Sequence, residues 1–484
     1  MTVLRRSILL FLFFSFCEGA IAQYTLSPSP SEVDTALSGD WRGTVISQTG
    51  SRYQLLLHIS AVVNGPCNVS YEMFGERPYA MHMTSASCEH HRLLFTNDSV
   101  NASFQGELLP EGDVMQGIWE QQRTRVSTRL YKVESTARPQ EPSESVPYVQ
   151  RPITIINRSM GIKLGGSLVL PNAARKHPLV ILISDAGQQD QNAEDATGHR
   201  PFFVLAHKLA EFGIATLRLD DRSVGASESA PIGTIDDESQ DIAAAIGRMI
   251  DESAIDTASI FLFGHGSGGL VAAEASRLTS TGIKGIIMAG TPAIDGQLWL
   301  LSRAKAADEL HGIDPPITAA ALRILSAWYE IVERDPNGGQ KAVDEMLAVS
   351  DSILNVNEQL LAVYPIAQQL KQANRRDYIS NTIIPWIRGF INSRAPERLD
   401  GLQIPVLSLI ADRDVIVPSK VNEPAWQGMF EVMPYLEMTV FPNVNHGFQS
   451  CEACTEDEAR NTEETINTGV ITAIARWILS FSRQ

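Results

Sequence analysis

The stretch Ile260-Phe261-Leu262-Phe263-Gly264-His265-Gly266-Ser267-Gly268-Gly269 decides the fold, together with the helical run 270–275 that follows it. An apolar strand, a glycine-packed turn and a helix in this order form the setting of a G-x-S-x-G motif, whose middle residue is a catalytic serine. Between Gly264 and Gly268, however, the middle residue is Gly266, which has no hydroxyl. Ser267 stands one position later, so the pattern predicts a hydrolase fold with a defective nucleophile.

Two registers of this turn are possible. With Gly266 at the apex, the flanking residues are Gly264 and Gly268, both small enough for the crowded turn. With Ser267 at the apex, His265 takes a flanking position where a side chain is costly. Glycine also adopts the strained apex conformation readily. The first register is therefore favoured, with Ser267 as a helix cap whose hydroxyl points away from the cleft.

Length and charge bound the kind of protein. The 484 residues predict more than one domain, and a net charge of −17 argues against nucleic acid and anionic membranes as partners. Residues 1–22 resemble a secretory signal, with Arg5-Arg6, an apolar run at 8–14 and an Ala20-Ile21-Ala22 cleavage site. We therefore expect an exported protein, periplasmic or secreted, and no segment that spans a membrane. Nothing in the sequence indicates its oligomeric state.

Four cysteines follow the signal: Cys67, Cys88, Cys451 and Cys454. An even number in an oxidising compartment predicts disulfides, and four cysteines allow three connectivities. The pairs Cys67–Cys88 and Cys451–Cys454 are favoured because each is local to one region. A redox role for the C-x-x-C is the alternative. A metal site would need further ligands than the distant His90-His91 pair, so no metal or cofactor is expected.

The chain divides by its patterns. Residues 23–135 contain short strand-like runs separated by turn residues, which predicts a small all-β domain, a barrel or a sandwich. Residues 136–152, rich in proline and polar residues, are predicted to form an extended linker.

From residue 153 to 484, strands and helices alternate, as in an α/β fold with a largely parallel sheet. The predicted strands lie at 178–183, 214–219, 260–263, 283–288, 405–410 and 438–441, with helices at 202–212 and 235–249. Between about 292 and 400 only helical patterns follow one another, at 319–332, 341–350 and 354–372. This insertion is predicted to be a lid. Its large aromatic residues could line a pocket, but more of them should form the lid's own core: Trp328, Tyr329, Tyr364 and Trp386.

Several segments together resemble exported bacterial α/β-hydrolases of the serine aminopeptidase and dienelactone hydrolase-like group. The segments are 218–227, Gly264–Leu270, 411–417 and 443–449, together with the Arg138-Pro139-Gln140-Glu141-Pro142 linker. The resemblance covers nearly all of the mature chain and implies an α/β-hydrolase fold with a helical lid behind a small β domain.

The resemblance places the acid of a catalytic triad at Asp414 and the base at His446, while the nucleophile position falls on Gly266. The family's oxyanion loop, T-G-S-G-P-Q-D-R, reads here Ser184-Asp185-Ala186-Gly187-Gln188-Gln189-Asp190-Gln191. Asp185 replaces a glycine where an oxyanion would form, and a carboxylate there opposes the charge that catalysis must stabilise. The oxyanion donors are expected among Asp185, Ala186 and Ser267.

Three functions follow as hypotheses. The favoured one is a catalytically impaired hydrolase that binds a small acyl, ester or peptide-like molecule. The alternative is an active serine hydrolase of esters or small amides, in which Ser267 attacks, His446 is the base and Asp414 orients it. A third keeps weak activity, with His446 activating a water in the space of the missing side chain.

Overall fold

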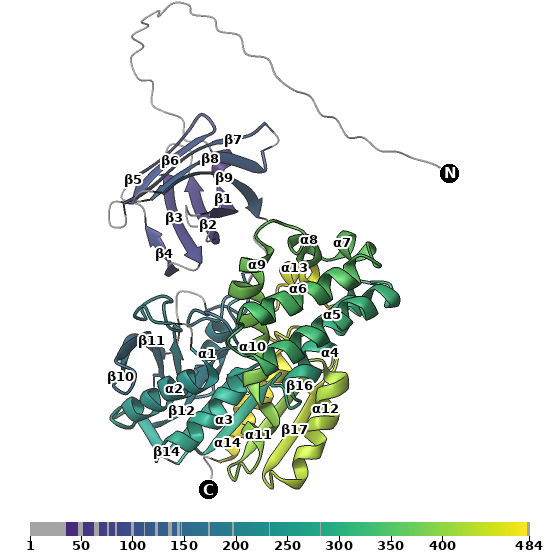
Figure 1. Cartoon of the computed structure of the whole chain (residues 1–484). Helices are drawn as coiled ribbons and strands as arrows, with labels where there is room; N and C mark the ends of the chain where they lie inside the picture. The colour runs from purple at the N-terminus through teal and green to yellow at the C-terminus, as the bar shows by residue number, and fades with distance from the viewer. Residues whose placement is uncertain are drawn as a thin grey trace, which may run out of the picture.

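The computed structural model describes residues 35–481 except 47–51, 62–66, 75–76, 83–84, 98–100, 111, 122–123, 134–137, 143–145, 147, 173–174, 196–197, 232 and 281. The predicted signal, residues 1–22, lies outside the described residues. Two sheets organise the described chain, a nine-stranded antiparallel sheet and an eight-stranded mixed sheet (Figure 1). The prediction of a small all-β domain before an α/β domain is confirmed.

The N-terminal sheet is antiparallel throughout and runs in the order β4-β3-β2-β1-β9-β8-β7-β6-β5. Its strands are β1 (Gly39–Ile46), β2 (Arg52–Ala61), β3 (Cys67–Phe74), β4 (Arg77–His82), β5 (Ser85–Glu89), β6 (Arg92–Asn97), β7 (Ala102–Leu108), β8 (Val114–Gln121) and β9 (Thr124–Val133). Side chains alternate along β6, β7 and β8 between a buried and a more exposed face. One face of the curled sheet therefore forms its core.

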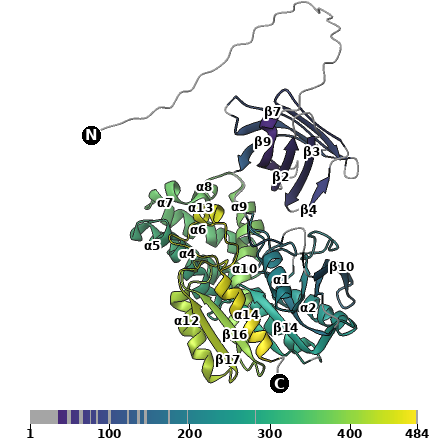
Figure 2. The ribbon, with the colours of Figure 1, turned by 180° about the vertical axis from the view of Figure 1, so that it is seen from behind.

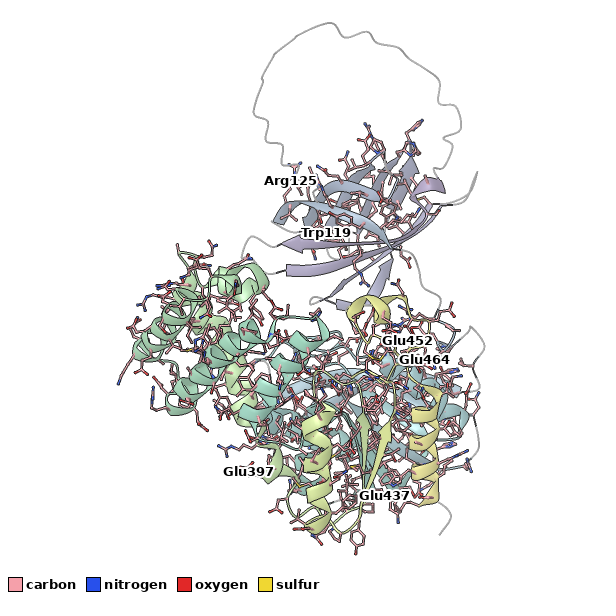
Figure 3. The ribbon with its side chains drawn as sticks, turned by 90° about the vertical axis from the view of Figure 1, so that its right-hand side faces the viewer. Trp119, Arg125, Glu397, Glu437, Glu452 and Glu464 are labelled. Atoms are coloured by element: carbon pink, nitrogen blue, oxygen red, sulfur yellow. A yellow bond between two sulfur atoms is a disulfide. The ribbon has the colours of Figure 1, made fainter. Side chains whose placement is uncertain are left out.

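That core is aromatic, and a disulfide holds the sheet closed around it. Trp119 stands within the curl while Arg125 points outward (Figure 3), and Trp119 packs edge-on to Tyr71 with ring centroids 5.1 Å apart. Cys67 on β3 and Cys88 on β5 form a disulfide. Because β3 and β5 lie near opposite edges of the sheet order, the bond joins the two edges into a nearly closed barrel. The predicted pairing Cys67–Cys88 is confirmed.

The linker differs from the prediction of an unpacked connection. Arg138 donates to the carbonyl of Thr462 at 2.8 Å, and the amide of Gln140 both donates to and accepts from the backbone of residues 465–466. Glu141 forms an ion pair with Arg200. The first strand of the second sheet also begins at Tyr148, inside the stretch 136–152 predicted as linker. Proline and polar content predicted a loop, but these side chains find partners on the following domain. The outer bounds 23–135 and 153–484 stay predictions.

The second sheet has the order β10-β11-β13-β12-β14-β15-β16-β17, with β10 and β11 antiparallel to their neighbours and the rest parallel. Its strands are β10 (Tyr148–Asn157), β11 (Ile162–Pro171), β12 (His177–Ile183), β13 (Ala215–Leu219), β14 (Ile255–His265), β15 (Gly285–Ala289), β16 (Val406–Ala411) and β17 (Leu436–Phe441). β12, β15 and β16 are fully buried, as apolar runs in a parallel sheet require. The predicted α/β-hydrolase fold is thereby confirmed.

Helices cover both faces of this sheet (Figure 2). α1 (Pro201–Glu211) and α14 (Thr468–Ser480) share one apolar core with the sheet, while α2 (Ile235–Ile250), α3 (Gly268–Leu278), α11 (Ala395–Leu399) and α12 (Ser419–Gly428) share the other. α2 begins at a capping box. The side chain of Thr234 accepts the N–H of Asp237, and the Asp237 carboxylate accepts the N–H of Thr234. The sheet therefore presents the carboxyl ends of its parallel strands as a rigid edge.

The helical insertion follows β15, as predicted. It contains α4 (Gly296–Leu310), α5 (Pro315–Arg334), α6 (Gln340–Leu354), α7 (Gln359–Val363), α8 (Pro365–Gln369), α9 (Arg375–Tyr378), the π-helical turn η2 (Ile379–Ile383) and α10 (Ile384–Ser393). The prediction of a single helix at 354–372 is wrong. α7 ends at Val363 and a new helix, α8, begins at Pro365, because the residue before a proline disfavours the helical conformation. Trp328 and Tyr329 lie in the insertion's own core and Tyr364 packs against it, while Trp386 is exposed.

No helix in the described ranges is long and apolar enough to cross a membrane.

Candidate active site

The turn between β14 and α3 follows the first of the two predicted registers. Gly266 has a left-handed backbone with φ of +53°, and its N–H donates to the carbonyl of Ala289 at 2.9 Å. A methyl group on Gly264 would lie 2.3 Å from the backbone of Gly268, and one on Gly268 would lie 2.3 Å from the carbonyl oxygen of Ser184. Ser267 already has a helical backbone. The apex of the turn is therefore Gly266, and the glycines on both sides are required by space.

Asp414 and His446 come together as the resemblance implied. Oδ2 of Asp414 lies 2.7 Å from Nδ1 of His446, while Oδ1 accepts the N–H groups of Ile416 at 2.8 Å and Val417 at 2.7 Å. The Asp414 side chain is almost fully buried. This turn after β16 fixes the carboxylate, and the carboxylate in turn orients the imidazole so that Nε2 faces the apex of the β14–α3 turn.

The group that meets Nε2 of His446 is the carboxylate of Asp185, at 3.3 Å from Oδ2. Asp185 is the second residue after β12, and its side chain fills the space above Gly266. A Cβ atom placed on Gly266 would lie 2.2 Å from Cγ and from Oδ1 of Asp185. A serine at position 266 and the observed Asp185 cannot occupy this site together. Asp185 thus stands where the nucleophile's side chain would be.

The same carboxylate also occupies the oxyanion donors. Oδ1 of Asp185 accepts the N–H of Ser267 and the N–H of Ala186, both at 2.7 Å. One donor is the residue after the apex and the other belongs to the loop after β12, which are the two places an α/β-hydrolase takes its oxyanion donors from. The resemblance placed Asp185 near the oxyanion site, and the structure places its side chain on these two N–H groups. Its side chain binds the donors directly, where the sequence indicated only a repelling charge.

Charge in the site is balanced by an ion pair. Burial alone would lower the pKa of the His446 imidazole, but the carboxylates of Asp414 and Asp185 outweigh it and raise the pKa to about 10. Burial alone would raise the pKa of Asp185, but the hydrogen bond and charge of His446, with the Ser267 N–H, hold it well below its usual range. At neutral pH an imidazolium therefore lies between two carboxylates, and a protonated imidazole cannot accept a proton.

Two further side chains border the site. Ser267 is buried, and its hydroxyl forms no hydrogen bond with any described residue, His446 included. His265 binds the carbonyl of His446 through Nε2 at 2.9 Å, and burial together with the nearby charge of His446 lowers its pKa. His265 is a neutral support for the histidine loop.

A cation from the lid lies close to this centre. Helix α4 is anchored by Trp299, whose indole N–H donates to the carbonyl of Ile416 at 2.8 Å, two residues after Asp414. Arg303 follows Trp299 by one helical turn, on the same face. Burial lowers the pKa of its guanidinium against the opposing charges of Asp185 and Asp414. Within the described ranges this guanidinium forms no ion pair, although the charges of Asp185 and Asp414 act on it.

The second predicted disulfide closes the loop beyond His446. Cys451 and Cys454 are bonded, and Glu458 accepts the N–H groups of residues 452–454. Glu452 and Glu464 lie in this region of the chain (Figure 3), and Glu464 accepts the N–H of Ser450 at 2.8 Å. The pairing excludes free thiols at these two positions, and no described group of three His, Cys, Asp or Glu side chains could hold a metal ion.

The model of the serine aminopeptidase S33 family matches residues 200–449, which is more than half of the chain and includes Gly266, Asp414 and His446. The chain belongs to the serine aminopeptidase S33 family. No curated protein matches it.

Several solved structures are similar to this chain over most of their own length. An esterase of Pyrococcus furiosus is 13% identical, with 71% of this chain and 97% of that chain covered and a TM-score of 0.43. Est1E of Butyrivibrio proteoclasticus, solved with ferulic acid bound, is 18% identical over 69% and 100%, with a TM-score of 0.40. A hyperthermophilic esterase of Pyrobaculum calidifontis is 15% identical over 71% and 85%, with a TM-score of 0.39.

The glycine-rich turn indicated Gly266, and the resemblance named Asp414, His446 and Asp185; the structure brings these four residues together. Two features of the centre were not predicted. The contact between Asp185 and His446 carried no signal, since the two residues are far apart in the chain. Arg303 was missed as well, because a lone arginine in a helical insertion is usually a solvated surface residue.

Proposed function

We propose that this member of the serine aminopeptidase S33 family no longer performs serine-dependent acyl transfer and is retained to bind a small acyl, ester or peptide-like molecule. We also propose that it is exported, in keeping with the signal-like residues 1–22 and with two disulfides, which persist in oxidising compartments.

One observation carries the proposal. The carboxylate of Asp185 lies over Gly266, accepts the N–H groups of Ser267 and Ala186, and faces Nε2 of His446. Acyl transfer needs a nucleophile next to a neutral imidazole and two free donors for the oxyanion. Asp185 interferes with each of these three requirements. Asp185 and the missing hydroxyl at Gly266 together account for the loss, so the fold can persist without the chemistry.

The alternative, an active enzyme that uses Ser267, has less support. Ser267 would have to move its hydroxyl to a histidine whose Nε2 already faces a carboxylate, and that histidine would have to lose a proton with a pKa near 10. A water activated by His446 meets the same difficulty, because the imidazolium holds its proton at neutral pH.

The test pairs hydrolysis with binding. The wild-type protein should release nitrophenol from p-nitrophenyl butyrate no faster than the His446→Ala variant does. N-phenylbutanamide, an amide analogue that resists hydrolysis, should raise the melting temperature of the wild-type protein. Turnover of the ester that Ser267→Ala abolishes would support the alternative, and the absence of any thermal shift with a panel of acyl amides would contradict the binding role.

A further inference from the structure

We propose that Asp185 is itself a nucleophile, which attacks an sp3 carbon that carries an anionic leaving group, such as the first carbon of a primary alkyl halide. This activity goes beyond the proposed function, because it uses a carboxylate and forms an alkyl ester where a serine hydrolase forms an acyl ester.

The two oxygens of Asp185 have different surroundings. Oδ1 is fixed by the N–H groups of Ser267 and Ala186, at 2.7 Å each, while Oδ2 has one neighbour, Nε2 of His446, at the longer distance of 3.3 Å. The Asp185 side chain remains 21% exposed, and the next residue, Ala186, is exposed. Oδ2 is therefore an oxygen of a partly exposed carboxylate that is held in place and keeps a free lone pair. Carboxylates in such positions act as covalent nucleophiles in other enzymes.

The electrophile must be an alkyl carbon. Attack of a carboxylate on an ester carbonyl gives a tetrahedral intermediate in which the carboxylate leaves more easily than an alkoxide, so the step returns to its start. Attack on an sp3 carbon has no such intermediate. The lone pair of Oδ2 forms the new carbon–oxygen bond, the carbon–halogen bond breaks, and the halide leaves with the bonding electrons.

The covalent step changes the state of His446. Once Asp185 is an uncharged ester, the imidazolium keeps only Asp414 as a counter-ion, its pKa falls, and it releases its proton to solvent. The neutral imidazole then takes a proton from water, which attacks Cγ of Asp185. The negative charge that forms on Oδ1 is already held by the N–H groups of Ser267 and Ala186.

The intermediate then collapses with balanced atoms. The bond between Cγ and Oδ2 breaks, so the alcohol leaves with the original Oδ2 and takes a proton from His446. The oxygen of the attacking water stays on Cγ and replaces Oδ2. The acid form of Asp185 returns its proton to His446, which restores the ion pair. The sum is alkyl halide and water to alcohol, halide and one proton.

The lid offers a site for the departing anion. Arg303 on α4 is one turn from Trp299, which is bonded to the turn of Asp414, and its charge acts on both Asp185 and Asp414. Its guanidinium forms no ion pair with a described residue, although the charges of Asp185 and Asp414 act on it. A halide released in the cleft is an anion of the kind that such a cation binds.

The experiment uses the full oxidised chain and 1-bromobutane. The wild-type protein should release bromide catalytically, and His446→Gln, which cannot activate water, should stop at a stable adduct with the mass of one butyl group on the peptide that contains Asp185. Asp185→Asn should lose both the release and the adduct. Asp256→Asn is the matched control: Asp256 accepts a backbone N–H and a hydroxyl near the start of β14, away from the site, and the control should behave as wild type. Arg303→Gln should slow bromide release.

A second measurement does not depend on any variant. A single turnover of the wild-type protein in H₂¹⁸O should place the label in the Asp185 carboxylate and leave the butanol unlabelled. Label in the butanol alone, an adduct on another residue, or no bromide release with no adduct in His446→Gln would each overturn the proposal. These outcomes leave the loss of serine chemistry intact, which only an acyl or phosphonyl adduct on Ser267 would contradict.

Discussion

Asp185 and His446 form an ion pair, with Oδ2 and Nε2 separated by 3.3 Å, at the point where a serine hydrolase would hold its nucleophile against its base. The residues are brought there by β12 and by the loop after β17, while Gly266 provides the space. In a serine hydrolase, Nε2 of the histidine would accept the proton of the serine hydroxyl. Here Nε2 of His446 faces the negative carboxylate of Asp185 instead.

The first prediction concerns the protonation of His446. Asp185→Asn removes one of two carboxylates that raise the pKa of His446 to about 10, and the pKa should fall by about 1–3 pH units. Because the folded pKa of His446 is raised and that of Asp185 is lowered, the pair stabilises the wild-type protein fully between the ordinary carboxylate pKa of 3.8 and the ordinary histidine pKa of 6.5. It loses this effect as pH rises toward 10 or falls below 3.8. NMR titration of the imidazole nitrogens measures the change. An imidazole that titrates near 6.5 in the wild-type protein would contradict the ion pair.

A second prediction isolates the crowding at the apex. Gly266→Ala should destabilise the protein by more than the roughly 1–3 kcal/mol of a left-handed alanine, because its Cβ would lie 2.2 Å from Cγ of Asp185. Gly161→Ala is the control for the backbone alone, since Gly161 has φ of +68° and no atom within 4 Å of its added Cβ. Urea unfolding compares the two, and adding Asp185→Gly should recover the difference. Equal losses in both alanine variants would show that Asp185 does not fill this space.

A buried ion pair between Arg222 and Asp241 gives a third prediction. Arg222 donates to Asp241 at 2.7 Å, both side chains are nearly fully buried, and Asn157 also donates to Asp241. Arg222→Met leaves the Asp241 charge without its cation and should cost about 3–5 kcal/mol of unfolding free energy. Arg125→Ala removes an exposed pair and should cost less than about 1 kcal/mol. Denaturant midpoints decide, and similar losses for the two variants would contradict the distinction.

The disulfides are expected to contribute unequally. Cys67–Cys88 closes a loop with a sequence separation of 21 and joins two edges of one sheet, whereas Cys451–Cys454 has a separation of 3. Loop-closure entropy then gives about 3 kcal/mol for the first bond and about 2 kcal/mol for the second. Replacing the second pair by alanine should mainly speed hydrogen exchange in the loop after His446. If the variant without Cys451 and Cys454 unfolded at a lower denaturant concentration than the variant without Cys67 and Cys88, the expected order of the two bonds would be wrong.

Sequence patterns predicted most of the local elements, and the features they missed were one local helix break and several contacts between distant residues. The strand, glycine turn and helix around Gly266 could be predicted because sterics favour one of the two possible registers. The β domain followed from short alternating runs, and the disulfide pairs from their separation. The break at Pro365 and the docked linker were missed, since one is a local chain break within an apolar pattern and the other depends on residues 462–466. For Asp185, sequence indicated the charge but not that two N–H groups and His446 would bind it.

The most direct measurement is labelling by a fluorophosphonate serine probe in four proteins. The wild type and Asp185→Gly should not react, because position 266 has no hydroxyl, and Gly266→Ser alone should react little, because Asp185 blocks its side chain and holds His446 protonated. Gly266→Ser with Asp185→Gly restores the hydroxyl, frees both donors and lowers the pKa of His446. This double variant should label more strongly than either single variant, by about 10²–10³-fold if the two donors are regained. Labelling of the wild type that Ser267→Ala abolishes, or equal labelling of Gly266→Ser with and without Asp185, would contradict the account.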